Sequence, residues 1–228
     1  MQRIYDCSVD TDLLTGMRLA KVSLGRKELV VFPTDTVYGL ACDAFSHEGV
    51  QKLLDAKGRD RQSPPPVLIG STSALAGLAH EIPNLALKLA ETYWPGALTI
   101  ILKAQPSLTW DLGETKGTVA LRMPDHKIAL ALLKETGPLA VSSANLTGQE
   151  AAITCQQAEA YLGSKVSVYL DGGSSPKAEA STIVDMTDLV DSVNESGEIV
   201  TTGKARVVRR GALSVEKLAI VLGENLEV

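Results

Sequence analysis

The sequence predicts an α/β protein with a mixed sheet, in which some neighbouring strands run antiparallel. Helix-like and strand-like segments alternate along the 228 residues, which favours one α/β domain. Apolar residues make up 45% of the chain and charged residues 21%, so the chain can bury a sizeable core. Aromatic residues make up only 4%, and the core is therefore expected to consist mainly of Val, Ile, Leu and Ala.

Two helices are predicted in the first quarter of the chain. Residues 13–25 have helical spacing and end at Gly25, a residue type favoured just after a helix. The apolar residues expected on one face of this helix are Leu13, Leu14, Met17 and Leu24. Residues 47–58 predict a second helix, with Ser46 as its N-cap and Gly58 at its end.

Short apolar runs bounded by Pro, Gly or polar residues predict the strands. These runs are "ELVVF" (28–32), "VLIG" (67–70), "ALTIILKA" (97–104), "TVALRM" (118–123), "LAVSS" (139–143), "VSVYLD" (166–171) and "STIVDM" (181–186). Helical spacing recurs in two stretches after residue 70, the second from Pro83 to about Trp94, and in 127–137, 155–163 and 214–223. The polar segment 192–204 predicts a hairpin or loop.

Composition argues against several classes of function. The formal net charge of −5 argues against a broad nucleic-acid surface, although it leaves room for a local basic pocket. No segment approaches the ~20 apolar residues of a membrane span, and the first residues lack the apolar stretch of a signal peptide. We therefore expect a cytoplasmic protein without membrane contact. Isolated cysteines and histidines indicate free thiols and no metal site. They are Cys7, Cys42, Cys155, His47, His80 and His126.

Polar and cationic residues gather beside the predicted strand ends. The stretches are "PTDTVYGL" (33–40), "KGRDR" (57–61), "TVALRMP" (118–124), "VSSAN" (141–145) and "STIVD" (181–185) with "VVRRG" (207–211). Thr118 and Arg122 lie four residues apart and so face the same side of a strand, and a cation between apolar neighbours needs an anion nearby. Cations and hydroxyl groups without a histidine, cysteine or carboxylate pair suit anion binding, as in phosphoryl or adenylyl transfer.

Each of these stretches also has a purely structural interpretation. Hydroxyl residues before Gly39 are typical of a turn, and serines commonly follow a strand. Lys57 and Arg59 at a helix end complement the helix dipole. The arginines at 209–210 are equally well explained as an exposed surface pair.

Seven segments resemble, in this order, the motifs of the Sua5/YrdC/YciO family. They are "FPTDTVYGL", "AKGRDR", "YWPGALTIIL", "VALRMPDH", "VSSANLTG", "STIVD" and "VVRRGA". The resemblance covers roughly residues 29–214, and the combination is specific although each motif alone is weak. It implies a twisted open sheet of mixed parallel and antiparallel strands with flanking helices, with the site in its concave face. Residues 1–228 are expected to form a single domain of this type.

The resemblance also implies an activity. Enzymes of this family join L-threonine, bicarbonate and ATP into L-threonylcarbamoyladenylate, a nucleotidyl transfer that releases pyrophosphate. That product feeds the t6A modification of tRNA, so tRNA-modification proteins are expected partners. ATP is a substrate, Mg²⁺ is expected to accompany it without a dedicated protein site, and direct RNA binding is expected to be weak or absent.

The family motifs imply roles for individual residues of this chain. Lys57 and Arg59 are the implied catalytic residues and meet the phosphates. The residues implied to bind the nucleotide are Lys57, Arg59, Thr118, Ser142, Asn145, Ser181 and Arg209. The residues implied to bind L-threonine are Thr34, Thr36, Tyr38, Arg122, Ser143 and Thr182, with Arg122 on the carboxylate.

The sequence departs from the family pattern at two positions. Because of these departures, one contact between the enzyme and its substrates is not assigned to a residue. Asp60 stands where family members often have proline, and "IGS" (69–71) occupies the place of a histidine. Two other interpretations also stay open. One is a module that binds double-stranded RNA, and the other is a YciO-type paralogue with a different small-molecule chemistry.

Overall fold

The structure, a computed structural model, describes residues 3–176 and 178–227. Its helices are α1 (Asp10–Gly25), α2 (His47–Lys57), α3 (Leu75–Leu78), α4 (Asn84–Tyr93), α5 (Lys127–Thr136), α6 (Cys155–Leu162) and α7 (Val215–Leu222). Short 3₁₀ turns lie at Thr72–Ala74, Gly163–Lys165 and Gly223–Asn225. The strands are β1 (Ile4–Asp6), β2 (Val30–Phe32), β3 (Gly39–Asp43), β4 (Val67–Leu68), β5 (Leu98–Lys103), β6 (Thr118–Arg122), β7 (Leu139–Ser143), β8 (Val168–Asp171), β9 (Thr182–Asp185), β10 (Val190–Val193), β11 (Ile199–Thr202), β12 (Ala205–Arg209) and β13 (Leu226–Glu227).

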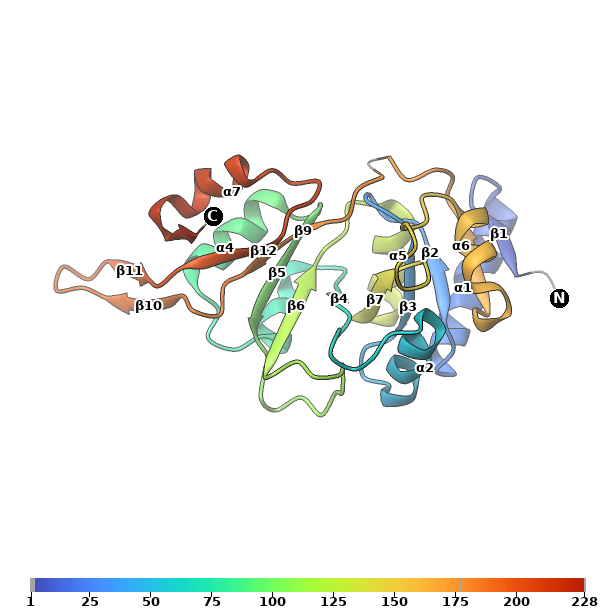
Figure 1. Cartoon of the computed structure of the whole chain (residues 1–228), viewed down its shortest axis with the longest axis horizontal. Helices are drawn as coiled ribbons and strands as arrows, with labels where there is room; N and C mark the ends of the chain where they lie inside the picture. The colour runs from blue at the N-terminus through green and yellow to red at the C-terminus, as the bar shows by residue number, and fades with distance from the viewer. Residues whose placement is uncertain (1–2, 177, 228) are drawn as a thin grey trace.

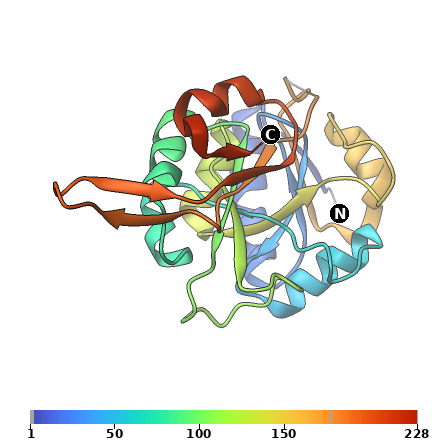
Figure 2. The same cartoon turned by 60° about the vertical axis from the view of Figure 1, so that its left-hand side comes forward.

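Eleven strands form one mixed sheet in the order β1-β8-β2-β3-β7-β4-β6-β5-β9-β12-β13. The pairs β1/β8, β4/β6 and β5/β9 are parallel, whereas β2/β3, β3/β7 and β5/β6 are antiparallel. Strands β10 and β11 form a separate hairpin that projects from the body of the molecule (Figures 1 and 2). The predicted mixed α/β sheet with flanking helices is confirmed, and the polar segment is a hairpin.

Helices cover the two faces of the sheet unequally. On one face, α1 and α5 pack against β1, β8, β2, β3 and β7 in a cluster that includes Leu24, Phe32 and Leu133. The opposite face carries a larger cluster, to which α2, α4, α6 and α7 all contribute. Farther along the face of α1 and α5, beyond β4, the strands present Arg122 and Thr99 instead of an apolar core. Because a polar sheet face inside a fold requires polar partners, this is where a ligand site is expected.

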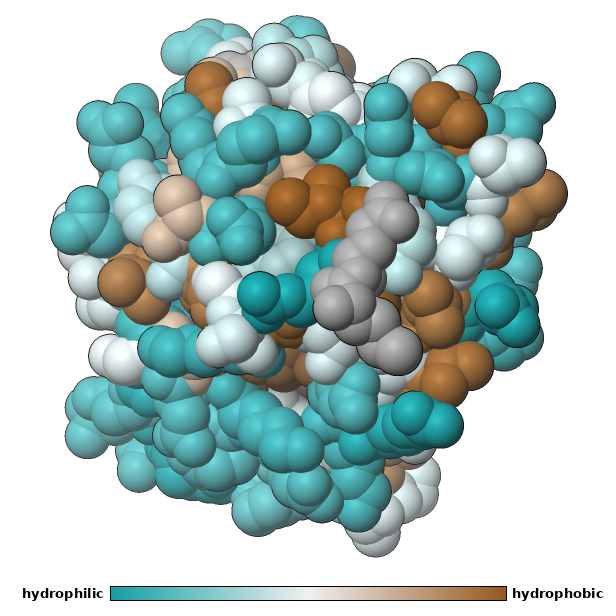
Figure 3. All heavy atoms as spheres, turned by 90° about the vertical axis from the view of Figure 1, so that its right-hand side faces the viewer, coloured by the Kyte–Doolittle hydropathy of each residue, from teal (hydrophilic) through white to brown (hydrophobic). Residues whose placement is uncertain are grey.

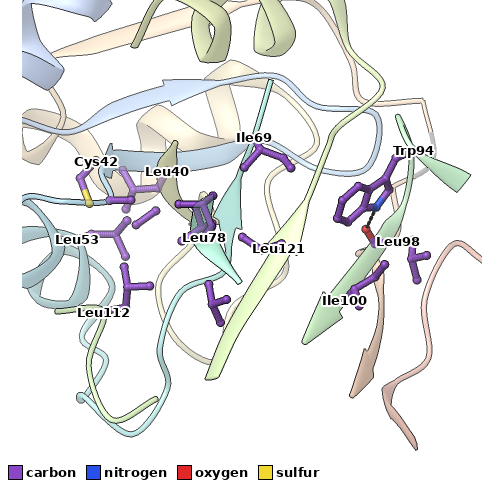
Figure 4. Packing of buried hydrophobic residues seen from close by; sticks show 14 of the residues in the cluster. Leu40, Cys42, Leu53, Ile69, Leu78, Trp94, Leu98, Ile100, Leu112 and Leu121 are labelled. Carbon is purple, nitrogen blue, oxygen red and sulfur yellow. Dashed lines mark hydrogen bonds between the residues drawn. The ribbon is translucent and has the colours of Figure 1, made fainter. Parts of the chain in front are cut away.

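The larger cluster runs continuously beneath both halves of the sheet (Figure 4). It joins Leu40 of β3 to Leu121 of β6, and both side chains are fully buried. Beside it, Trp94 Nε1 donates a hydrogen bond to the Leu98 carbonyl at 2.7 Å. Burying each such leucine stabilises the fold by about 1.5–3 kcal/mol, so this shared core stabilises both halves of the sheet together.

Helix α2 begins and ends where the sequence predicts. Ser46 Oγ accepts a hydrogen bond from the Gly49 amide at 3.0 Å, which satisfies one of the unpaired amides of the first turn. Gly58 follows the helix with φ of 63°, in the left-handed region that glycine adopts without strain. These local signals place Lys57 and Arg59 at the junction between α2 and the following loop.

The apolar face predicted for the first helix is wrong at Leu14, which is 72% exposed. Leu24 is buried as predicted and Met17 packs against the same cluster, while the other buried residues of the helix are the small ones, Gly16, Ala20 and Ser23. Helix α1 also starts earlier, at Asp10, and Gly25 lies within it. Four strands of the main sheet were not predicted, namely β1, β3, β12 and β13. Of these, β3 was missed because "PTDTVYGL" is typical of a turn at its start, although the chain becomes extended from Gly39.

The end of the molecule that carries β1, α1 and α6 is mostly hydrophilic, with separate apolar patches (Figure 3). Val9, Leu14 and Val22, in and beside α1, are exposed apolar side chains. None of the helices in the described ranges is both long and apolar enough to cross a membrane.

Candidate active site

A cavity of about 260 Å³ opens on the polar part of the sheet face. Its walls are the turn 34–39 after β2, the loop 59–66 after α2, and residues at or beside the ends of β6, β7, β9 and β12. The polar residues that line it are Thr34, Thr36, Tyr38, Arg59, Ser63, Thr99, Arg122, Ser142, Ser143, Ser181 and Arg209. Apolar lining comes mainly from Val37, Pro64, Pro66, Leu68, Val141 and Ile183.

Three guanidinium groups converge on this cavity, from Arg59, Arg122 and Arg209. Burial lowers the pKa of Arg209, and the positive charges of Arg122 and Arg59 lower it further, because the three groups lie close together. Of these three arginines, only Arg122 has a carboxylate within ion-pair distance among the residues that the structure describes. Like charges held together in a partly buried site attract a compensating anion, so the cavity is built for anionic ligands.

A β-bulge directs Arg209 into the cavity. Val207 lies opposite Val184, but the next partner, Ile183, lies opposite Arg209, so Val208 is the extra residue of the bulge. Without it, the alternation of a regular strand would place Arg209 on the face of the large core. The bulge therefore moves a cation from the core face to the ligand face.

Serine oxygens hold two of the three guanidinium groups. Nη1 of Arg59 donates to Ser142 Oγ at 3.4 Å. Nε and Nη2 of Arg209 donate to the Ser181 carbonyl at 3.0 and 2.8 Å, and Nη2 also donates to Ser181 Oγ. Thr99 Oγ1 lies 2.8 Å from Ser181 Oγ and completes this chain. These uncharged partners fix the two arginines without neutralising them.

Arg122 is buried at the bottom of the cavity and is held on three sides. Its Nε donates to the Gly96 carbonyl at 3.0 Å, Nη1 donates to Thr36 Oγ1 at 3.0 Å, and Nη2 donates to Asp35 Oδ1 at 2.5 Å. A guanidinium has five N–H groups, so one remains on each terminal nitrogen. Burial lowers the pKa of Arg122, and the Asp35 carboxylate opposes that shift. A Cβ on Gly96 would lie 2.5 Å from the Tyr93 carbonyl, so only glycine brings this loop to Arg122.

The hydroxyl groups of Thr34 and Thr36 form an ordered chain behind Arg122. Thr34 Oγ1 donates to the Val37 carbonyl at 2.6 Å and lies 3.1 Å from Thr36 Oγ1. Because Thr34 gives its proton to the Val37 carbonyl, Thr36 is the donor in the contact between the two hydroxyls, and Thr36 Oγ1 also accepts from Arg122. Both hydroxyl protons are thus committed, and Thr36 is fully buried. In this arrangement the pair supports Arg122 from behind.

Lys57 does not line the cavity, although it was predicted to meet the phosphates. Its ammonium is buried beneath the turn that follows β7 and donates to the Ser143 carbonyl, to the Asn145 carbonyl at 2.7 Å and to Asn145 Oδ1 at 3.3 Å. Burial lowers the pKa of Lys57 to about 7, and the charge of Arg59 adds to this effect. Lys57 therefore ties α2 to the "SSAN" turn, and its contact with phosphate stays a prediction.

The structure brings together most, but not all, of the residues predicted for the site. Thr118 lies at the other end of β6 from Arg122, and its hydroxyl donates to the Thr115 carbonyl. Thr182 is fully buried and donates to the Leu213 carbonyl at 2.5 Å. These two side chains do not line the cavity, and neither does Asn145. The ligand contacts predicted for them stay predictions.

Tyr38 lines the cavity, but its hydroxyl faces elsewhere. That hydroxyl donates to the Gly173 carbonyl at 2.5 Å and accepts a hydrogen bond from the Gly172 amide at 3.1 Å. Asp60, one of the two departures from the family pattern, is exposed and forms a turn with the Gln62 amide. It does not line the cavity.

Three polar residues of the site were not assigned a role from the sequence, Asp35, Ser63 and Thr99. Thr99 is the polar member of the apolar strand "ALTIILKA", and strict alternation along that strand places it on the face of Arg122. Asp35 lies between two threonines in a stretch that is typical of a turn, where an acidic residue is usually exposed. Only the fold shows that Asp35 is 4% exposed and paired with Arg122.

Comparison with known sequences gives close matches over most of the chain. A sequence profile of the Sua5/YciO/YrdC family, described as "Telomere recombination", matches residues 23–208. A Mycobacterium leprae protein is 44% identical over 223 residues, which cover 98% of this chain and 95% of that protein. The threonylcarbamoyl-AMP synthase of Bacillus subtilis is 36% identical over 200 residues, 87% of this chain and 57% of that enzyme.

Solved structures with similar folds include a long and a short relative. Pyrococcus abyssi Sua5 complexed with L-threonine aligns with a TM-score of 0.85 and 30% identity, over 99% of this chain and 62% of that chain. Escherichia coli YciO aligns with a TM-score of 0.77 and 22% identity, over 96% of this chain and 100% of its own. At that identity, the similarity to YciO establishes the fold alone.

Proposed function

We propose that this chain, which belongs to the Sua5/YciO/YrdC family, is a threonylcarbamoyl-AMP synthase. In this proposal it joins L-threonine, carbon dioxide derived from bicarbonate and the adenylyl group of ATP, and releases pyrophosphate. Relatives in Bacillus subtilis and Pyrococcus abyssi carry the name threonylcarbamoyl-AMP synthase. The observation that supports the proposal most strongly is the cavity on which three arginines converge, of which only Arg122 is paired with a carboxylate among the described residues.

The proposed reaction has two steps, and each involves anions. Bicarbonate takes up a proton and loses water to give carbon dioxide. The neutral amine of L-threonine attacks that carbon dioxide, and the nitrogen then gives up a proton to water, which leaves a carbamate. A carbamate oxygen then attacks the α-phosphorus of ATP, and the bond from that phosphorus to the bridging oxygen breaks, so that pyrophosphate leaves. A carbamate decomposes readily in water, so a cationic cavity that limits access of water suits both steps.

The geometry suggests a different ligand group for each arginine. Arg122 is proposed to hold the threonine carboxylate through the N–H groups that remain on its two terminal nitrogens. Arg59 and Arg209 have no carboxylate partner in the described chain and are proposed to hold the phosphates. Ser142 and Ser181 keep those two side chains in place. Catalysis would then consist mainly of positioning and charge neutralisation.

Lys57 is proposed as a positioning residue. It binds the "SSAN" turn from below and so fixes the backbone beside Ser142 and Ser143. Asn145 shares this role, because its amide nitrogen donates to the Leu146 and Gln149 carbonyls. This positioning role differs from the predicted contact between Lys57 and phosphate. For that contact, the ammonium would have to release the backbone and side-chain oxygens that now accept its hydrogen bonds.

The described residues offer no cluster of ligating side chains to which Mg²⁺ can be assigned. In residues 3–176 and 178–227, no group of three or more His, Cys, Asp or Glu side chains could hold a metal ion. We propose that Mg²⁺, where it is used, comes with ATP.

We further propose a single domain over residues 1–228, because every wall of the site is a strand of the same sheet or a loop that leads into one.

Location and partners follow from the same proposal. Cytoplasmic location is supported by the free thiols of Cys7, Cys42 and Cys155, which suit a reducing compartment. The proteins that use the product for tRNA modification are the proposed partners. Direct RNA binding is expected to be weak and to disappear with modest salt, because the net charge is −5 and the three arginines lie in a cavity.

The test measures pyrophosphate release from ATP with and without L-threonine and bicarbonate. We expect release only when both are present. Release that does not depend on threonine would support a YciO-type chemistry instead. RNA binding in the nanomolar range at physiological salt, without turnover, would support the RNA-binding alternative.

A further inference from the structure

The cavity contains an imbalance of charge that the proposed chemistry does not by itself require. Three arginines face it, yet the one carboxylate lies beside Arg122 and not beside Arg59 or Arg209. If the cavity only had to gather anions, a carboxylate here would weaken it. The position of this carboxylate therefore points to discrimination between two kinds of anion.

Asp35 is paired with Arg122, which lines the cavity, but Asp35 does not line the cavity itself. It is 4% exposed, and its Oδ1 accepts from Arg122 Nη2 and from the Asp125 amide at 3.1 Å. Its Oδ2 is buried and has no hydrogen-bond partner in the part of the chain that the structure describes. Burial lowers the pKa of the neighbouring His126, and the charges of Asp35 and Asp125 oppose that shift. Among the described residues, Arg122 is the one cationic side chain within ion-pair distance of Asp35.

We infer that Asp35 is a specificity-determining residue, which reserves Arg122 for a monoanionic carboxylate and keeps polyphosphate on Arg59 and Arg209. This inference rests on the proposed function, in which one site must hold an amino acid and ATP together. Without discrimination, the polyphosphate of ATP would compete for all three arginines and block the amino acid.

The physical basis is that repulsion from Asp35 grows in proportion to the charge of the ligand. A carboxylate carries one negative charge, whereas a terminal phosphate carries about 1.5 to 2 near neutral pH. A carboxylate on the two free N–H groups of Arg122 retains its hydrogen bonds and meets modest repulsion. A phosphate in the same place meets roughly twice that repulsion, or more when its chain adds further charges.

Asp35→Asn separates this role from a merely structural one. Asparagine keeps an acceptor oxygen for Arg122 and for the Asp125 amide, while the negative charge is lost. The matched control is Asp125→Asn, which removes one carboxylate charge from an exposed position next to the same hydrogen bond. A structural role predicts similar changes for every ligand, whereas the charge role predicts a selective gain for polyphosphate.

The experiment uses calorimetry with L-threonine and inorganic tripolyphosphate, each alone and then together. In the unaltered protein, we expect tripolyphosphate to leave threonine binding unchanged. In Asp35→Asn, the Kd for tripolyphosphate should fall about tenfold, the Kd for threonine should change less than about threefold, and the two should compete. Asp125→Asn should behave like the unaltered protein.

Three results would overturn the inference. They are competition already in the unaltered protein, equal gains for both ligands in Asp35→Asn, and a gain in Asp125→Asn as large as in Asp35→Asn. The first needs no variant and therefore decides the matter even where Asp35→Asn does not fold. Failure of the proposed function would look different, since pyrophosphate release would not depend on threonine whatever the calorimetry gave.

Discussion

Nη1 of Arg122 donates a hydrogen bond to Thr36 Oγ1 at 3.0 Å, which joins the end of β6 to the turn after β2. These residues are 86 positions apart in the chain, and both are buried. The contact connects the two halves of the sheet at the bottom of the cavity. Because a buried donor without its acceptor is costly, the position of Arg122 depends on residues from both halves.

Arg122→Lys should raise the requirement for L-threonine strongly and leave ATP affinity nearly unchanged. A lysine cannot reproduce the paired N–H groups of a guanidinium or its three fixed contacts. The expected loss in threonine binding is about 1.5–3 kcal/mol, the range for a hydrogen bond to a charged group. Separate titrations of each ligand by calorimetry check this. Equal weakening of both ligands, or of neither, would show that Arg122 does not bind the carboxylate.

Thr36→Val should weaken threonine binding through Arg122, without any loss of ligand contact by residue 36 itself. Valine has nearly the same shape but leaves Nη1 of Arg122 without its buried acceptor, which costs about 1–3 kcal/mol of stability. The KM for threonine should rise while the KM for ATP stays the same. The control is Thr99→Val, which removes a buried hydroxyl on the side of Arg209 and should affect ATP instead. The same KM shifts in both variants would contradict this division of the cavity.

Sequence reasoning succeeded where a signal depends on near neighbours. Ser46 and Gly58 delimit α2 because a cap is satisfied within a few residues, and the apolar runs that became β5, β6 and β7 carry their own periodicity. It failed for Leu14 of α1, whose exposure depends on how the helix meets a distant partner. A Cβ on Gly16 would lie 2.8 Å from Tyr5 and Leu170, so this helix approaches the sheet through its glycine, and Leu14 is left in solvent.

The sequence predicted the chemistry of the candidate site, but it did not predict the directions in which individual side chains point. Hydroxyls and cations beside strand ends indicated an anion site, and Arg59, Arg122 and Arg209 do converge. The direction of Lys57 depends on how α2 meets the "SSAN" turn, and the direction of Arg209 depends on a bulge at Val208. Neither is encoded in local spacing, because both result from packing between segments far apart in the sequence.

Because of the lowered pKa of Lys57, the free energy of unfolding should increase as pH rises above neutrality. Its pKa is about 7 in the folded protein and close to 10.5 when exposed, so between these values the unfolded chain binds a proton that the folded chain does not. Stability should therefore increase with pH across this window, by at most about 1.4 kcal/mol per pH unit. The measurement compares urea unfolding of the unaltered protein and Lys57→Met at about pH 7 and about pH 9.

Lys52→Met serves as the control for that comparison, since it removes an exposed ammonium from the same helix. The stability difference between the unaltered protein and Lys57→Met should change with pH in favour of the unaltered protein. A difference that is constant over the window would mean that Lys57 keeps its proton throughout, held by its three oxygen acceptors.

Arg209→Gln should raise the KM for ATP and leave threonine binding intact. Glutamine removes the positive charge that the bulge directs into the cavity. Among the described residues, no carboxylate neutralises Arg209, so its full charge is available to a phosphate and is lost in the variant. Because part of this side chain faces solvent, we expect about 1.5 kcal/mol, the lower end for a charged hydrogen bond and roughly a tenfold change. Arg206→Gln, on the same strand but paired with Asp185, should leave both KM values unchanged. If the two variants behave alike, Arg209 acts as a surface arginine, and the phosphates must be held by Arg59 without it.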